Sequence, residues 1–249
     1  MLTCNPKGNY SFLPGGQAFS DGVVSAEGFE IIRVVFEEFI PWQQGFQLIS
    51  NHLVSKGRSK QALCAIELRC PQPFSGEGFA NFNAQYYSLL EEWGILVDGC
   101  NPVARTNVAP VLNPPTETSV YAFAYAAPIE SNQRSTFVAS GVGEITVTDQ
   151  GEQKIIRQGE ISENAIQEKV AIVMSILENR IGALEQTWSK VTTANVYTVH
   201  DIHPLIEDDI LAKFGRASIR GILWQYARPP LIDLEYEMDL RSHCKEYYL

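Results

Sequence analysis

The sequence predicts an α+β fold built from two similar modules in tandem, each with the element order ββαβαββ. Three observations lead to this prediction. A segment near position 105 recurs near position 220. In both halves the repeated segment follows a stretch of helical periodicity and a β-rich stretch. A length of 249 residues also suits two modules of about 120–130 residues each, a common domain size.

The internal repeat is the strongest of these signals. A single shift of 115 residues aligns three features without a gap: Arg105 with Arg220, Pro114-Pro115 with Pro229-Pro230, and Tyr121 with Tyr236. Each copy is therefore an arginine, an apolar strand, a Pro-Pro turn and a second strand. Proline suits the connection because it cannot donate to a β-ladder.

The other elements of the first half follow from local patterns. Apolar spacing predicts two helices, and runs of β-branched and apolar residues predict the strands. In order, we expect a strand over 22–36, a helix over 42–57, a strand over 60–70 and a helix over 78–93.

The second half is expected to repeat this order. Its elements are a strand over 137–148 with a turn at 141–143, a helix over 163–184, a strand over 191–198 and a short helix over 205–214 that ends at Gly215. The polar segment 129–135 is the predicted linker, which divides the chain into modules 1–130 and 131–249.

Composition excludes several classes of protein. Hydrophobic residues make up 45% and charged residues 19%, and the mean hydropathy is −0.09, which is typical of a globular chain. No apolar run reaches the roughly 18 residues of a membrane helix, and the N-terminal residues do not resemble a secretion signal. We therefore expect a cytoplasmic protein with no membrane contact. The five cysteines form no CxxC motif, which favours reduced thiols.

The charge balance argues against nucleic acid as a partner. The net charge is −10, with 7 basic and 12 acidic residues in 1–130 and 12 and 17 in the remainder. Each half thus carries −5, and no cluster of Lys and Arg is present to neutralise phosphates. A small anionic substrate is still compatible, since one buried arginine suffices for one carboxylate.

Arg220 and Glu235 form the main candidate site in the second half. An arginine at the start of a strand offers a planar, bidentate donor for a carboxylate. A glutamate on the following antiparallel strand, if partly buried, has a raised pKa and can shuttle protons. The alternative is a structural ion pair. Arg105 has no matching acid, so it is either structural or a carboxylate-binding residue without catalysis. Ser140 and Gly141 offer further donors to a bound carboxylate.

Other signatures of chemistry are weak. His200 and His203 form an HxxH pattern without a fixed further ligand, so no metal site is expected. The chain contains no GxSxG, Walker A or GxGxxG motif.

Several motifs together resemble the RidA (YjgF/UK114) family. In the second half the family's arginine, turn proline and acidic strand correspond to Arg220, Pro229 and Glu235-Tyr236-Glu237. In the first half, PVARTNV around Arg105 and GFANFNAQYY, with Asn83 and Tyr86, match the family's arginine and helix motifs.

This resemblance implies chorismate-mutase-like modules, each a sheet with two helices on one face, assembled as trimers with clefts between subunits. It implies hydrolysis of a small carboxylate-bearing enamine or imine to a keto acid and ammonia, without a cofactor. Arg220 would anchor the carboxylate and Glu235 would activate water. Substrate-binding residues would be Ser140, Gly141, Arg105 and Asn83.

The chain also departs from the family pattern. Val120 stands where active members carry a glutamate, and the second half has no clear counterpart of Asn83. Two alternatives therefore stay open. One is a pathway-specific hydrolase of a related C–N bond on the same fold. The other is a non-catalytic module that binds metabolites or partners.

Overall fold

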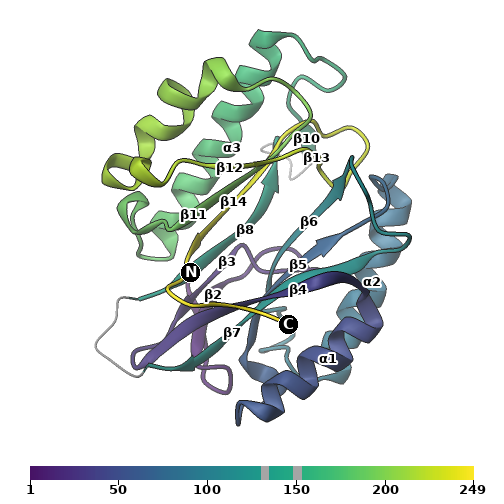
Figure 1. Ribbon diagram of the computed structural model, residues 1–249, viewed down its shortest axis with the longest axis vertical. Helices are drawn as coiled ribbons and strands as arrows, with labels where there is room; N and C mark the ends of the chain where they lie inside the picture. Colours follow the sequence, from purple (N-terminus) through teal and green to yellow (C-terminus); the bar gives the residue numbers. More distant parts are fainter. Residues whose placement is uncertain (130–134, 148–152) are drawn as a thin grey trace.

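The computed structural model describes residues 1–129, 135–147 and 153–249 and has a mixed α+β fold. Two sheets lie face to face between helices on the outer sides (Figure 1). The first sheet has the strand order β1-β2-β3-β8-β14-β11-β12 and the second has the order β13-β6-β5-β7-β4-β15. The predicted linker and the end of the predicted strand 137–148 fall partly outside the described residues.

The first sheet is formed by strands from both ends of the chain. They are β1 (Thr3–Asn5), β2 (Tyr10–Leu13), β3 (Gly22–Ser25), β8 (Phe137–Gly143), β11 (Thr193–Tyr197), β12 (Leu223–Gln225) and β14 (Glu237–Ser242). Helix α3 (Glu163–Ala183) covers its outer face through Val170, Val173 and Leu177. Ser162 caps α3, because its side chain accepts from the N–H of Ala165.

The second sheet carries the other two helices. Its strands are β4 (Phe29–Pro41), β5 (Leu63–Arg69), β6 (Ala104–Pro110), β7 (Ser119–Pro128), β13 (Ala227–Arg228) and β15 (Glu246–Tyr248). Helices α1 (Trp42–Ser55) and α2 (Gly76–Glu92) pack on its outer face. The small sheet of β9 (Ile145–Val147) and β10 (Gln153–Ile155) lies apart.

The central strands of the two sheets have the same topology. The order β4-β7-β5-β6 in one sheet corresponds to β8-β14-β11-β12 in the other, with one parallel pair in each at β5–β6 and β11–β12. The two halves also exchange edge strands, since β1–β3 extend the sheet of β8 while β15 pairs with β4. Strands thus cross the predicted boundary at residue 130 in both directions.

The predicted helices over 42–57, 78–93 and 163–184 are confirmed as α1, α2 and α3. Three details of the prediction are wrong. The strand over 22–36 is divided between the sheets, because Gly28 takes a left-handed conformation (φ 80°) in the turn between β3 and β4. No turn interrupts 141–143, since β8 continues to Gly143 in register with Glu237.

The third detail is the short helix over 205–214. This region forms a succession of irregular helical turns, 203–205, 206–210 and 211–220. The backbone bends at Gly215 (φ 53°) as expected for a helix end, but helical turns resume and continue to Arg220. Arg220 therefore precedes the strand instead of opening it.

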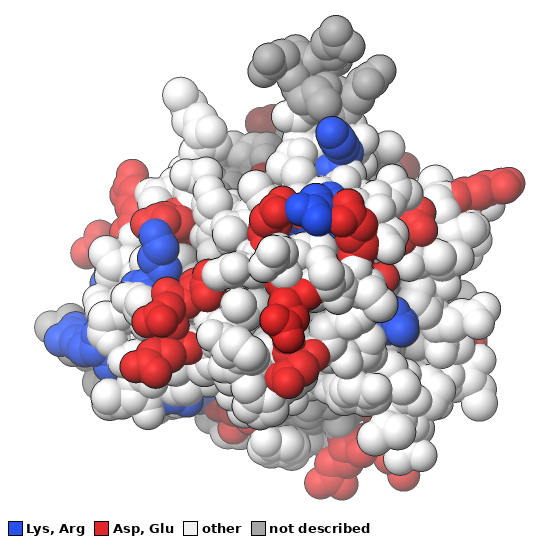
Figure 2. Space-filling view, turned by 90° about the horizontal axis from the view of Figure 1, so that it is seen from above, with Lys and Arg blue, Asp and Glu red and all other residues white. Residues whose placement is uncertain are grey.

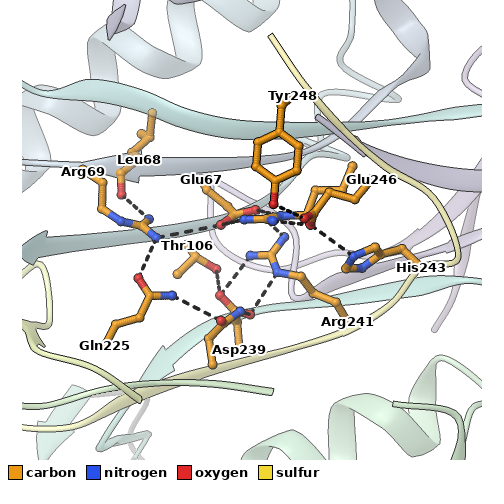
Figure 3. A network of polar contacts seen from close by, with 12 residues as sticks. Glu67, Leu68, Arg69, Thr106, Gln225, Asp239, Arg241, His243, Glu246 and Tyr248 are labelled. Carbon is orange, nitrogen blue, oxygen red and sulfur yellow. Dashed lines mark hydrogen bonds and ion pairs between the residues drawn. The ribbon is translucent and has the colours of Figure 1, made fainter. Parts of the chain in front are cut away.

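A buried network of charged side chains joins the inner faces of the two sheets (Figure 3). Glu67 on β5 binds Arg33 Nε at 2.6 Å and Arg241 Nη1 at 3.0 Å. Asp239 on β14 accepts from Thr106 Oγ1 at 2.8 Å, from Tyr197 and from Arg241. Because buried ions need partners, this network fixes how the two sheets face each other, and thereby the site between them.

Replacing Glu67 by Gln is expected to lower the free energy of unfolding by about 3–5 kcal/mol, since it leaves buried guanidiniums without their counter-ion. Burial disfavours the Glu67 carboxylate, but Arg241, Arg33 and Arg69 outweigh it and hold its pKa well below the usual range. Its contribution is therefore present at neutral pH and is lost as the pH falls below the ordinary glutamate pKa. Urea denaturation at pH 7 and pH 4 measures both effects. Glu178→Gln, at an exposed pair with Lys213, is the control and should change little.

Candidate functional site

A cavity of about 1270 Å³ opens between the two halves of the chain. Its walls are the loop before β3, one side of α2, the end of β8 and the last turns of α3. The residues that line the cavity include Phe19, Asp21, Asn83, Gly141 and Arg180. Because both halves contribute walls, the site depends on how the two sheets are joined.

A β-bulge at the cavity shapes one wall. Between the pairs Met238–Val142 and Leu240–Ala139, two residues of β8, Ser140 and Gly141, oppose the single residue Asp239 of β14. Such a bulge re-aims side chains and is common beside active sites. Here Ser140 meets β6, and the backbone of Gly141 lies against the Glu237 carboxyl.

Glu237 is a buried acid next to the cavity wall. It is 3% exposed, and its side chain forms no ion pair or hydrogen bond with the described residues. Burial raises its pKa well above the ordinary value, the neighbouring carboxylates Asp239 and Glu144 add to this, and Arg105 opposes it. A carboxyl whose pKa is raised in this way keeps its proton to higher pH than an ordinary glutamate, which suits a general acid.

Arg105 on β6 is a buried cation on the α2 side of the cavity. Its guanidinium lies among Phe19, Tyr86 and two further aromatic rings, at 4.8 Å and 4.9 Å from the centroids of the first two. One terminal nitrogen donates to Asn83 Oδ1 at 2.7 Å, while the other, Nη1, is buried and has no partner among the described residues. Burial lowers the pKa of Arg105 to about 10, so the side chain stays charged at neutral pH.

The four residues predicted to bind substrate lie together. Asn83 and Gly141 line the cavity, and Asn83 orients Arg105. The Ser140 hydroxyl donates to Ser20 O at 2.6 Å and accepts from the N–H of Arg105 at 3.1 Å. Both roles of that hydroxyl are thus used within the protein, where they join β8 to β6 and to the loop before β3.

Arg220 and Glu235 do not form the predicted pair. Arg220 is exposed and donates to the carbonyl of Val191. Glu235 pairs with His200 at 2.7 Å and with Arg228 at 3.3 Å. The structure therefore gives the two predicted catalytic residues different partners and does not pair them with each other.

Strand register explains why Arg220 has no equivalent role. In the sheets, Arg105 is opposite Ile66 and Ile66 is opposite Phe123. In the second half, Trp224 is opposite Val196 and Val196 is opposite Met238. Since Phe123 and Met238 are related by the 115-residue shift, Trp224 holds the position of Arg105. The ungapped alignment missed a connection that is four residues longer before β12.

The His200–His203 motif forms separate polar contacts. His200 binds Glu235, and His203 binds Asp201 at 2.7 Å. Within the described ranges, no group of three or more His, Cys, Asp or Glu residues is arranged to hold a metal ion.

The described part of the chain also contains no helix that is long and apolar enough to cross a bilayer. Figure 2 shows a face rich in Asp and Glu with scattered Lys and Arg.

Sequence reasoning missed Glu237 and Arg180. The alternation Glu237, Asp239, Arg241 on a strand flanked by apolar residues was the available signal, because it places three charged residues on one buried face. Arg180 carries no such signal, as arginine near the end of a helix is common on surfaces.

Substituting Gly141 by Ala is expected to lower about tenfold the kcat of any reaction that uses Glu237 as its acid, because the added Cβ would collide with the Glu237 carboxyl and with Thr106 and move the acid. Gly141 has an ordinary backbone conformation, so only the close approach demands glycine. Steady-state kinetics measures the change in kcat, and thermal unfolding shows whether the variant is still folded. Gly182→Ala on α3 adds a Cβ into open space and should keep full activity with equal or greater stability.

The fold and cavity define an α+β protein with an acid and an arginine at a site between two halves. The chain belongs to the family described as 2-aminomuconate deaminase CnbZ, which matches residues 2–247. A relative from Comamonas testosteroni, named 2-amino-5-chloromuconate deaminase, is 37% identical over 244 residues, covering 97% of this chain and 96% of its own. The family and this relative are thus enzymes that act on C–N bonds.

Two solved structures show weaker similarity. A chorismatase has a TM-score of 0.47 and 10% identity, covering 89% of this chain and 77% of its own. A Thermotoga maritima protein described as an endoribonuclease has a TM-score of 0.33 and 20% identity, covering 55% of this chain and 92% of its own. At these scores neither defines a function for the chain.

Proposed function

We propose that this protein is a hydrolytic deaminase of a 2-aminomuconate-type substrate, an unsaturated enamine that carries carboxylates. The products would be a 2-oxo acid and ammonia. The observation that carries the proposal is the buried Glu237, which lies against Gly141 of the cavity wall and whose pKa is raised, on the same cavity as Asn83, the partner of Arg105. Membership of the deaminase family supports the reaction class, and the name of the relative supports the substrate class.

The proposed chemistry uses Glu237 twice. Its carboxyl donates a proton to carbon of the conjugated enamine, which becomes an iminium ion. Water then adds to the iminium carbon, and the Glu237 carboxylate takes the proton that the water releases. The resulting carbinolamine transfers its hydroxyl proton to nitrogen and expels ammonia. The sum is substrate plus water giving oxo acid plus ammonia, and Glu237 ends protonated as it began.

Arg105 would bind the carboxylate next to the reacting carbon. Its unpaired Nη1 supplies a charge-assisted donor. Since Nη1 is sealed behind aromatic side chains, the ring of Phe19 has to move aside when substrate enters. Asn83 would hold the guanidinium plane during binding. The route requires no metal or organic cofactor.

The architecture of the chain fits a further part of the proposal. We interpret the two halves as RidA-like modules, 1–130 and 131–249, joined so that one cleft combines Arg105 of the first with Glu237 of the second. The equivalent position in the second half would not bind a carboxylate, because Trp224 stands there where the first half has Arg105. A homotrimer in the cytoplasm stays the expected assembly, to be measured by light scattering.

The proposal is tested by supplying freshly generated 2-aminomuconate and measuring ammonia and the 2-oxo dicarboxylate. We expect equal amounts of the two products and a rate well above the uncatalysed one. A parallel assay with 2-iminopropanoate distinguishes a specialised enzyme, which should turn it over poorly, from a general imine hydrolase. Binding of 2-aminomuconate without ammonia release would contradict the proposal and indicate a metabolite-binding module.

A further inference from the structure

Arg180 is a second cation on the cavity wall that the reaction described above does not use. It lies in the last turn of α3, with its side chain 13% exposed, and it lines the cavity. One terminal nitrogen donates to the carbonyl of Ser140 at 2.9 Å and the other to Asp21. Its remaining N–H groups, including Nε, donate to no described residue.

The contacts of Arg180 hold its guanidinium in place and leave some of its N–H donors available. A guanidinium has five donors in one plane, and only two of these hydrogen bonds are formed with the described residues. Asp21 is itself about one-third exposed, so water shares its charge. Arg180 is therefore fixed in orientation and still able to bind a carboxylate.

Arg180 and Arg105 lie on either side of the same short segment. Ser140 accepts from the backbone of Arg105 through its hydroxyl and from Arg180 through its carbonyl. Burial lowers the pKa of both arginines; Tyr86 at Arg105 and Asp21 at Arg180 are the main opposing groups, and Glu237 adds a smaller opposing contribution at each. Glu237 is thus within electrostatic reach of two guanidiniums that approach one cavity.

Apolar side chains also line this cavity. Ile176 lies one turn before Arg180 on α3, and Val142, Phe79 and Ala80 add further apolar surface. A ligand that matches this pattern has a carboxylate at each end and an unsaturated hydrocarbon chain between them.

We infer that Arg180 binds the second carboxylate of the substrate, so that the cavity selects conjugated dicarboxylates over monocarboxylates. Asp21 acts as the positioning residue that orients Arg180. This inference rests on the proposed function for the choice of substrate, but it concerns binding and can be measured without turnover.

The test compares two unreactive six-carbon dienoic acids, muconate and sorbate, which differ in the second carboxylate. Calorimetry on the wild-type protein is expected to show muconate binding at least about 30-fold more tightly, the size of a charge-assisted hydrogen bond pair. Arg180→Gln should reduce this preference to about threefold or less while sorbate binding stays near the wild-type value.

Sorbate binding doubles as the control for folding. Arg216→Gln, the same change at an exposed arginine outside the cavity, should keep the full preference for muconate. If Arg180→Gln does not fold, Arg180→Lys replaces it: the ammonium cannot keep the bonds to Ser140 and Asp21 and also bind a carboxylate in one plane, so the preference for muconate should fall at least about threefold. An unchanged preference in Arg180→Gln, or equal loss of both ligands in a folded variant, would overturn the inference.

The result also separates this inference from the proposed function. If 2-aminomuconate is deaminated but the preference for muconate does not depend on Arg180, only the inference fails. If the preference depends on Arg180 but no ammonia is released, the dicarboxylate site stands and the proposed reaction fails.

Discussion

Glu237→Gln is expected to lower kcat for deamination about 1000-fold, within the range typical of losing a positioned general acid. The amide has nearly the shape of the protonated carboxyl. The close packing of Gly141 against the side chain at position 237 and against Thr106 should therefore be kept. Only the ability to donate and accept a proton is removed. Stopped-flow measurement of ammonia release from 2-aminomuconate, with KM determined separately, checks the result.

The stability of this variant gives an independent signature. A buried carboxyl with a raised pKa stabilises the fold most below the ordinary glutamate pKa, and this contribution is lost as the pH rises toward the folded-state value. Glutamine has no such loss. Glu237→Gln should therefore unfold at the same or a higher temperature than the wild type near pH 8. A structural role for an ionised Glu237 predicts the opposite.

The pH dependence of kcat follows from the protonation of Glu237. Wild-type kcat should fall as the pH rises through the raised pKa of Glu237, because the acid form is required first. Glu235→Gln is the matched control, since Glu235 pairs with His200 and Arg228, and it should change kcat less than about threefold. More than a tenth of wild-type kcat in Glu237→Gln would rule out the proposed acid.

Local patterns were sufficient to predict the three long helices and the central strands of both sheets. The spacing of apolar residues over 163–184 predicts α3 to within one residue at its C-terminal end. Such patterns depend on which face of an element is buried, and the spacing of apolar residues within a short stretch of sequence indicates that face. They do not state which sheet a strand joins, so the division at Gly28 and the exchange of β1–β3 and β15 could not be predicted.

The site was predicted only in part, for a related reason. Arg105, Asn83, Ser140 and Gly141 were singled out, and the structure brings them close together, with Asn83 and Gly141 on the cavity wall. The acid was assigned to Glu235 by sequence spacing, whereas Glu237 is the residue beside Gly141. Spacing along one chain cannot reveal that an arginine of one half meets a carboxyl of the other. That meeting depends on sheet packing, which the Glu67 and Asp239 network controls.

Replacing Arg105 by Met is expected to lower kcat/KM about 1000-fold, because it removes the anchor that aligns the reacting carbon with Glu237. Methionine fills a similar space among the aromatic rings. Arg105→Lys should recover little, since an ammonium cannot donate to Asn83 and to the substrate carboxylate from one rigid plane, as the guanidinium can. Steady-state kinetics on 2-aminomuconate, with sorbate binding by calorimetry, measures both the rate and the lost carboxylate contact.

The stability of Arg105→Met decides between a binding role and a structural one. The buried guanidinium has one unpaired nitrogen and no ion pair among the described residues. Exchanging such a cation for an apolar side chain is expected to leave the melting temperature unchanged or raise it. Arg220→Met, at an exposed arginine that donates to the Val191 carbonyl, should retain wild-type kinetics. If Arg105→Met is active, or if Arg220→Met loses as much activity, the carboxylate anchor belongs elsewhere. Loss of activity together with a large fall in melting temperature would make Arg105 a structural residue of β6.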